Sequence, residues 1–259
     1  MITLKYFLLD ATKHKSRVCQ LYFIGAFLQA KIKNTSFVKL DSIYADYFPE
    51  YSKYFGRALR LLKSMYGMPH SGKLFSGELT EWLLEAVFIK YQCQMSIYYN
   101  YAPDGRICFV LSYVNDFVYC YTYEALEKWF VDTLEKRFHV NFLVYAYWLM
   151  SIIISQMKDH TISVDQARYA TSNVAKYLDT PTAKATTKFY KTTLPSDMIL
   201  TKADTSTSDE QVERLNRGCN IHYRSSIGSS IYLLSTRVGF IFEVHKVGKF
   251  LENLSKVHF

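Results

Sequence analysis

Asp116 is the residue of this sequence whose type and setting point most directly to chemistry. It follows Asn115 between two apolar runs, residues 107–114 and 117–121, which are rich in Val, Phe and Tyr. Such residues favour half-buried strands, and Asn and Asp favour the tight turn of a β-hairpin. A carboxylate at a hairpin tip can bind a divalent cation, because hard cations prefer anionic oxygen ligands. Turn residues between strands are common, so a purely structural turn is the alternative.

The composition predicts a folded, basic protein. Of its 259 residues, 49% are hydrophobic and 17% aromatic, which supplies a core and argues against disorder. The net charge is +8 at pH 7 and the isoelectric point is about 9.1. A basic balance favours an acidic partner, of which nucleic acid is the usual one. A basic surface without a specific partner is the alternative explanation of this charge.

The cysteines and the hydropathy pattern indicate where in the cell the protein is expected. The cysteines are odd in number and include no Cys-x-x-Cys pair: Cys19, Cys93, Cys108, Cys120 and Cys219. This pattern argues against a disulfide framework, a disulfide-linked partner or a zinc site, and it predicts a reducing location, cytoplasmic or nuclear. No uncharged apolar run approaches the roughly 18 residues of a membrane span. We therefore expect no membrane partner.

Hydrophobic periodicity predicts a chain of mixed helices and strands. Helices are expected at residues 2–14, from a cap at Ser71 or Ser76 to residue 87, from a cap at Thr122 to residue 137, and at residues 165–178, 227–235 and 240–251. Strands are expected at residues 18–27, 36–40, 57–64, 96–101, 106–113, 117–121, 140–143, 148–157 and 161–164. This order of elements predicts an α+β fold.

A change of composition divides the chain. From about residue 179 the sequence becomes rich in Thr, Ser, Lys and Asp and contains two prolines, which is typical of a linker or a poorly packed loop. We therefore expect a core at residues 1–178, a polar linker at residues 179–221 and a helical segment at residues 222–259.

Two motifs resemble those of a known family. Residues 20–30 resemble motif A of the reverse transcriptases of copia-type retrotransposons, in which a strand ends in a metal-binding Asp and Ala-Phe-Leu follows after three residues. Ala26-Phe27-Leu28 are present here, but Tyr22 stands at the position of the Asp. Tyr113-Val114-Asn115-Asp116 resembles the Tyr-Val-Asp-Asp tip of motif C in that family, with Asn115 replacing the first Asp.

Further resemblances follow in the same order as in the family. Residues 64–75 resemble its Leu-Tyr-Gly-Leu turn into a helix, where the basic residue matches Lys73. Residues 161–169 resemble its strand-to-helix step. Residues 223–237 resemble its helix leading toward an RNase H part, although Val238-Gly239 stand where an Asp is usual.

The resemblance implies a fold and its missing parts. We expect a polymerase palm-like mixed or antiparallel sheet packed with helices, the start of a thumb, and a short helical C-terminal tail that leads toward a missing RNase H domain. Because the sequence begins just before motif A, we also expect incomplete fingers.

The resemblance also implies a reaction that this sequence is poorly equipped to perform. The family carries out RNA-directed DNA polymerisation on an RNA/DNA primer–template with two Mg²⁺ ions, which three carboxylates hold. Here Asp116 is the retained carboxylate, whereas Asn115 and Tyr22 offer only neutral oxygens. We predict that Mg²⁺ is not bound productively and that Asp116 remains as a vestigial turn residue.

Two other positions match nucleotide contacts of the family. By resemblance, Phe27 packs under the sugar of the incoming nucleotide and excludes a 2′-hydroxyl, and Lys73 approaches phosphate at the start of a helix. The structural alternatives are a core aromatic for Phe27, which the loss of the metal ligands favours, and a solvated side chain for Lys73.

These observations predict the reverse-transcriptase region of a copia-type Pol polyprotein, in a degenerate and catalytically inactive copy. One alternative is a non-catalytic nucleic-acid-binding module with a basic groove lined by Arg57, Arg60 and Lys63, although such a strand face is more often solvent-facing. Another alternative is that Tyr22 and Asn115 are lesions of this copy. Their reversion to Asp would then restore some activity, unless the missing fingers prevent it.

Overall fold

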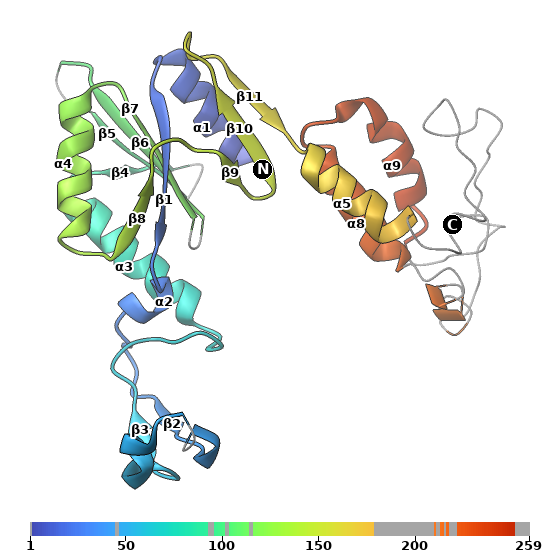
Figure 1. The fold of residues 1–259 in the computed structure, drawn as a ribbon. Coiled ribbons are helices and arrows are strands. Elements are labelled where there is room, and N and C mark those ends of the chain that lie inside the picture. Colours follow the sequence, from blue (N-terminus) through green and yellow to red (C-terminus); the bar gives the residue numbers. More distant parts are fainter. Residues whose placement is uncertain are drawn as a thin grey trace. The chain divides into compact units, whose positions relative to one another are not determined.

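The computed structural model describes residues 2–44, 47–92, 96–101, 104–113, 116–178 and 222–251, with residues 210, 213, 214, 216 and 217 (Figure 1). The chain forms two compact units, Met1–Tyr147 with Ser155–Ile162, and Trp148–Ile154 with Ser163–Phe259. The boundary between them differs from the one expected after residue 178, because the helix that ends there packs within the second unit. Most of the expected linker, residues 179–221, lies outside the described residues.

The first unit is built on a six-stranded antiparallel sheet. In spatial order its strands are β4 (Ile89–Lys90), β5 (Ile97–Tyr101), β6 (Ile107–Tyr113), β7 (Asp116–Tyr121), β1 (Arg17–Phe23) and β8 (Val140–Leu143). The central strands β6, β7 and β1 are almost entirely buried, as their continuous apolar sequences require. The order places β1, from the start of the chain, directly beside the hairpin of β6 and β7.

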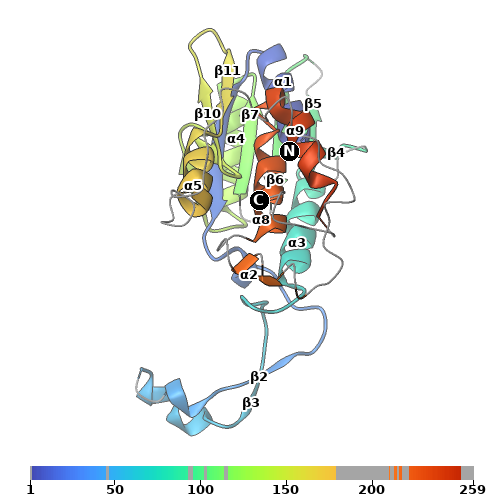
Figure 2. The same ribbon diagram turned by 90° about the vertical axis from the view of Figure 1, so that its right-hand side faces the viewer.

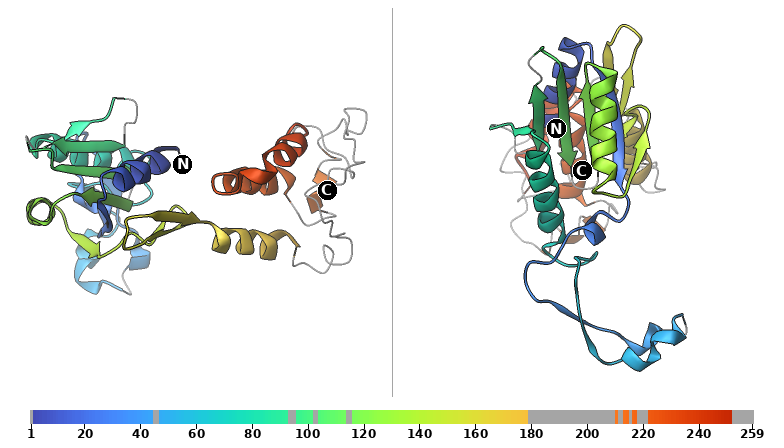
Figure 3. Two further views of the ribbon diagram at one scale, coloured as in Figure 1. Left: turned by 90° about the horizontal axis from the view of Figure 1, so that it is seen from above. Right: turned by 90° about the vertical axis from the view of Figure 1, so that its left-hand side faces the viewer.

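Helices cover both faces of this sheet. α3 (Ser71–Glu85) and α4 (Glu124–Glu135) lie side by side against one face, and α1 (Ile2–Lys13) packs on β1 and β6 from the other (Figure 3). The buried residues of α1 recur at helical spacing, which confirms the stripe predicted from the sequence: Leu4, Phe7, Leu8 and Ala11. The sheet is therefore the middle layer of the first unit.

The core between the sheet and the helices α3 and α4 is largely aromatic. Phe23 of β1 makes edge-on ring contacts with Phe75 of α3 at 4.9 Å and with Phe117 of β7 at 5.6 Å between centroids. Phe130 of α4 is fully buried and packs on Phe117. Edge-to-face and offset contacts of this kind add to the stabilisation that burial of the rings provides.

Residues 31–63 form a separate segment of the first unit, which we call the arm. It contains β2 (Phe37–Lys39) paired with β3 (Ala58–Arg60), and two short 3₁₀ helices, η1 (Ser42–Tyr44) and η2 (Pro49–Tyr54) (Figure 2). Strands are present within both expected ranges, 36–40 and 57–64, but each is three residues long. None of the described arm residues is buried, so the arm has no core of its own.

The chain between β8 and α5 (Ala167–Leu178) forms a three-stranded sheet in the order β11-β10-β9. Its strands are β9 (Trp148–Leu149), β10 (Ile152–Gln156) and β11 (Ile162–Asp165). The sequence predicts one strand at residues 148–157, but the chain turns at Met150 and Ser151, which both have positive φ angles. The two halves therefore pair with each other.

The second unit contains three helices. α5 contacts α8 (Tyr223–Leu233), and α8 contacts α9 (Ile241–Gly248), which follows the 3₁₀ helix η4 (Val238–Phe240). Tyr223, Ile227 and Phe250 form a small buried cluster there. In the part of the chain that the structure describes, no helix combines the length and the apolar character needed to cross a membrane.

Two expected helix caps are wrong. The N-cap of α3 is His70, and Ser71 instead donates its hydroxyl to the carbonyl oxygen of Met65 at 2.5 Å. The N-cap of α4 is Tyr123, whereas the Thr122 hydroxyl accepts a hydrogen bond from the backbone N–H of Ile107 at 3.0 Å. In both cases the hydroxyl forms its hydrogen bond with a backbone group outside the helix, so the helix begins without a side-chain cap.

The described cysteines are free thiols inside the first unit: Cys19, Cys108 and Cys120. Burial raises the pKa of Cys19 to about 11, and it also raises the pKa of Cys108 and of Cys120. These thiols are therefore poor nucleophiles at neutral pH. Cys93 and Cys219 lie outside the described residues.

Candidate active site on the central strands

Two of the residues singled out in the sequence are neighbours in the sheet. Tyr22, near the end of β1, pairs with Asp116, the first residue of β7. Residues that are directly opposite each other on antiparallel strands present their side chains on the same face. The positions that correspond to motifs A and C therefore meet in space, as the resemblance to a polymerase requires.

The pair belongs to a row of four residues across four neighbouring strands. Asn141 of β8 lies opposite Tyr22, and Tyr113 of β6 lies opposite Asp116. The next residue along β1 and the next along β7 are phenylalanines that point into the core under α3 and α4. Because side chains alternate along a strand, the row lies on the other face of the sheet. Asn141, Tyr22 and Tyr113 are exposed there, and Asp116 is half-buried.

The side chain of Tyr22 is held away from Asp116. Its hydroxyl oxygen accepts a hydrogen bond from the amide Nδ2 of Asn141, on the strand at the opposite side of β1 from β7. The phenol therefore extends toward β8, away from the carboxylate that the resemblance makes its partner. The sequence did not reveal Asn141 or Tyr113 as members of this row, because neither occupies a metal-binding position of the motifs and only the strand register places them there.

Asp116 is a half-buried carboxyl group. Desolvation raises its pKa above the ordinary value for aspartate, because burial penalises the charged form. Among the described residues, no ion pair or hydrogen bond of its side chain offsets that penalty. The sheet therefore positions a carboxylate here at some cost to stability.

Replacing the carboxyl group of Asp116 by an amide tests whether its ionised form lowers the stability of the folded state. When the folded-state pKa of an acid is raised, the folded state binds protons more tightly, and stability is lost as the pH rises above the unfolded-state pKa. We expect Asp116→Asn to raise the melting temperature by a few degrees at about pH 7 and to have little effect at about pH 3, below the ordinary pKa of Asp. Thermal unfolding across this pH range measures the difference. The same substitution at the exposed Asp132 of α4 is the control, and an equal rise there would contradict the argument.

The other two predicted contact residues lie where α2 (Ala26–Gln29) meets α3. The chain reaches α2 through Gly25, whose φ of 60° is readily accessible only to glycine. Phe27 is half-buried: its ring lies 4.9 Å from that of Tyr66, and it packs against the core. Lys73 is the third residue of α3, is exposed, and has no ion pair among the described residues. These environments agree with the structural alternatives, a packed aromatic and a solvated lysine.

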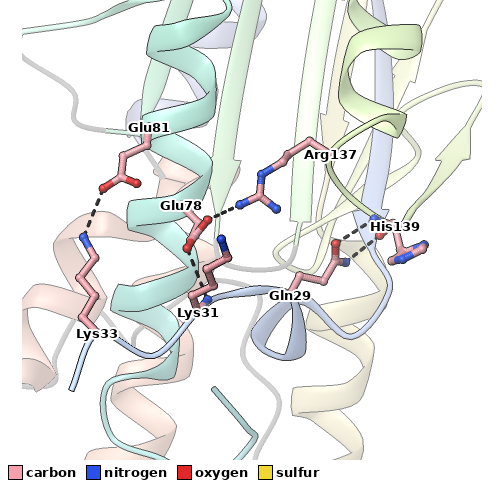
Figure 4. Close-up of polar contacts among 7 residues, drawn as sticks. All are labelled: Gln29, Lys31, Lys33, Glu78, Glu81, Arg137 and His139. Carbon is pink, nitrogen blue, oxygen red and sulfur yellow. Dashed lines mark hydrogen bonds and ion pairs between the residues drawn. The ribbon is translucent and has the colours of Figure 1, made fainter. Parts of the chain in front are cut away.

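A set of polar contacts that the sequence did not predict links the end of β1 to the start of β8 (Figure 4). The Gln29 amide donates to the carbonyl oxygens of Ile24 at 2.8 Å and His139 at 2.9 Å, and its Oε1 accepts from the His139 backbone N–H at 2.8 Å. Nearby, Glu78 of α3 forms an ion pair with Arg137. A glutamine far from its partners in the chain leaves no signal in the sequence that could reveal this role.

The residues of the row do not fit the metal centre that the resemblance implies. Two divalent ions that bridge a nucleotide and a primer require several hard, anionic ligands. The described part of the row supplies one carboxylate, one amide and two phenols. Across the described chain, no group of three or more His, Cys, Asp or Glu residues is placed to hold a metal ion. Asn115, the remaining position of the expected site, lies outside the described residues.

A cavity of about 300 Å³ in the first unit is lined by residues of α3, β5 and β6, among them Tyr113 of the row. The second unit contains a cavity of about 470 Å³, lined mainly by apolar surfaces of α5, α8 and α9. Val174, Tyr177, Ile227 and Leu233 are among its lining residues. None of the site residues predicted from the sequence contributes to this cavity.

The comparison with protein families identifies the family of the chain. The family described as "Reverse transcriptase (RNA-dependent DNA polymerase)" matches residues 3–191. The chain belongs to this reverse transcriptase family, which acts on a nucleic-acid template and primer and generally uses divalent metal ions. Its structure is a mixed α+β fold with antiparallel sheets. No curated protein and no solved structure matches the chain.

Proposed function

We propose that this chain is the reverse-transcriptase region of a copia-type Pol polyprotein and that it has lost polymerase activity. The observation that carries the proposal is the pairing of Tyr22 with Asp116. This pairing joins the two positions that must provide metal ligands, yet one of them holds a phenol. The family match supports the ancestry, and the order of the copia-like motifs supports the subtype.

The loss of activity follows from electrostatics. Three carboxylates would give the empty site three negative charges, which attract two Mg²⁺ ions and are neutralised by them. With Tyr22 and Asn115 in place, Asp116 contributes one charge, and burial already disfavours its ionised form. An amide oxygen is a weaker ligand for Mg²⁺ than a carboxylate, and the Tyr22 hydroxyl is engaged by Asn141. The site therefore lacks the negative charge that two closely spaced cations require.

The same proposal assigns the described helices and strands to the subdomains of a polymerase. The six-stranded sheet with α3 and α4 corresponds to a palm, and the arm corresponds to a part of the fingers. On this assignment, α5 and the helices after it correspond to the start of a thumb and to the segment that leads toward RNase H. The exposure of Tyr22 and Tyr113 beside Asp116, on the part of their sheet face that α1 leaves open, supports the assignment, since a palm must keep its metal-binding positions accessible to primer and template.

Primer extension tests the proposal. The purified chain is incubated with an RNA template, a labelled DNA primer, all four deoxynucleotides and either Mg²⁺ or Mn²⁺, beside an active reverse transcriptase. We expect no templated extension by this chain under either metal ion, because the substituted positions cannot assemble the metal pair. Templated incorporation above that of a heat-inactivated sample would refute the inactivity.

A further inference from the structure

The cavity of the second unit has the size of a site for a small organic molecule. Its volume is about 470 Å³, and it is bordered by α5, α8 and α9, of which α8 contacts both of the others (Figure 1). Pockets that bind small ligands commonly have volumes of about 300–1,000 Å³. The size of the cavity therefore justifies asking which ligand its lining would select.

Much of the lining is an apolar surface formed by the inner faces of α5 and α8. The lining residues of α5 are spaced by three and four positions, as one helix face requires: Ala170, Asn173, Val174 and Tyr177. Ile227 and Leu233 are among the lining residues of α8. Such a surface favours a hydrocarbon chain or ring, because contact with it removes apolar area from water.

Several hydroxyl groups of the lining already donate their hydrogen within the protein. Ser226 donates to the carbonyl oxygen of Tyr223 at 2.8 Å, and Ser230 donates to that of Ser226 at 3.0 Å. The Tyr223 hydroxyl donates to the carbonyl oxygen of Val247 at 2.9 Å. A hydroxyl has one hydrogen to donate, so these three groups cannot also donate to a ligand.

Asn173 retains a hydrogen-bond donor that the protein does not use. Its side chain lines the cavity, and its Nδ2 atom is buried without a hydrogen-bond partner among the described residues. An unpaired buried amide costs stability. A half-turn of the amide about χ2 exchanges its nitrogen and oxygen, so the N–H groups can face the cavity. A ligand with an acceptor oxygen would then remove the cost.

Arg237 gives the cavity a positive charge. It follows α8, lines the cavity, is exposed, and forms no ion pair with another described residue. The described lining includes no Asp or Glu that would neutralise this charge. A guanidinium group matches a carboxylate well, because its planar N–H groups can donate to both oxygens.

We propose that this cavity binds a carboxylic acid with an apolar body, such as a fatty acid of medium chain length. Arg237 holds the carboxylate, Asn173 donates to one of its oxygen atoms, and the apolar body lies along Val174, Ile227 and Leu233. The cavity contains none of the metal-binding positions, so this binding is a property separate from the proposed loss of polymerase activity.

Isothermal titration calorimetry of the whole chain tests the ligand class with three compounds of equal chain length: decanoate, decanol and decyltrimethylammonium. We expect saturable one-to-one binding of decanoate. Decanol, which lacks the charge, should bind about tenfold more weakly, since a hydrogen bond to a charged group contributes about that factor. The cationic compound should bind more weakly still, because it meets Arg237 without a neutralising carboxylate.

A pair of arginine variants tests the cation. Arg237→Gln should weaken decanoate binding about tenfold and leave decanol binding unchanged, because only the charged ligand loses a partner. Arg224 is exposed on the same helix but does not line the cavity. Arg224→Gln therefore changes the net charge equally and should bind decanoate like the wild type.

Two further variants test the amide and the apolar surface. Asn173→Leu should weaken decanoate binding yet raise the melting temperature without ligand, because it removes an unpaired buried amide. An asparagine with a purely structural role would show the opposite change in stability. Val174 is 54% exposed, so Val174→Trp can be accommodated without disturbing a core, and it should weaken both decanoate and decanol by filling the cavity.

Four results would overturn the proposal: no saturable binding of decanoate, equal affinity for decanol, equal losses from Arg237→Gln and Arg224→Gln, or unchanged decanoate affinity in Val174→Trp. Primer extension is measured separately, so the proposed loss of polymerase activity and this binding site can each fail alone.

Discussion

Replacing Tyr22 and Asn115 together by Asp is expected to create a cation-dependent protein from one that does not respond to divalent metal. In the double variant, the new carboxylate at position 22 would lie directly opposite Asp116 on the neighbouring strand. Like charges that face each other across strands are destabilising, so without metal the variant should unfold at a lower temperature than the wild type. Binding of Mn²⁺ or Mg²⁺ would relieve the repulsion and stabilise the folded state by mass action.

The magnitude of this change is measurable by thermal unfolding in EDTA and in a Mn²⁺ titration. A ligand at 100 times its dissociation constant stabilises the folded state by about 2.7 kcal/mol. For a protein of this size, that corresponds to a rise in melting temperature of roughly 5–10 °C. The single variant Tyr22→Asn, which removes the phenol without adding charge, should show no such rise.

An equal Mn²⁺-dependent rise in the wild type would contradict the prediction, because it would mean that the row already binds the metal. Primer extension by the double variant addresses the separate hypothesis that Tyr22 and Asn115 are lesions of this copy. Templated incorporation by the variant, but not by the wild type, would support that hypothesis.

Replacing Phe130 by Ala is expected to destabilise the first unit strongly. Phe130 is fully buried, and its ring contacts those of Tyr119 at 5.1 Å, Phe88 at 5.7 Å and Trp82 at 6.1 Å. Removing a buried aromatic ring costs about 3–5 kcal/mol, because it loses the transfer free energy and leaves a cavity. Chemical denaturation followed by near-ultraviolet circular dichroism measures the change.

The neighbouring residue provides a matched control. Trp129 precedes Phe130 on α4 but is 38% exposed, and its ring stacks on that of Phe88 with 6.3 Å between centroids. We expect Trp129→Ala to cost about 1 kcal/mol, the typical effect of a substitution without a large cavity. If Trp129→Ala destabilised the protein as much as Phe130→Ala, the described packing of α4 on the sheet would be wrong.

Helices with a clear apolar stripe were predictable from local sequence. The stripe of α1 predicts both the helix and its four buried residues, because a period of 3.6 residues depends only on neighbours in the chain. The caps at Ser71 and Thr122 were not predictable, since a hydroxyl can bond to any nearby backbone group and here bonds outside the helix. The split between β9 and β10 was missed for a related reason. The sequence of residues 148–157 favours a strand throughout, and only the pairing of its two halves explains the turn.

The sequence by itself determined which ligands the candidate site can offer. A phenol at position 22 and an amide at position 115 are neutral in any fold, so the deficit of negative charge follows from residue identity alone. Only the tertiary structure decided that Tyr22 and Asp116 are cross-strand neighbours, that Asn141 holds the Tyr22 hydroxyl, and that Asn173 and Arg237 line one cavity. Strand register and burial arise from segments distant in the chain, and no local pattern specifies which of those segments will meet.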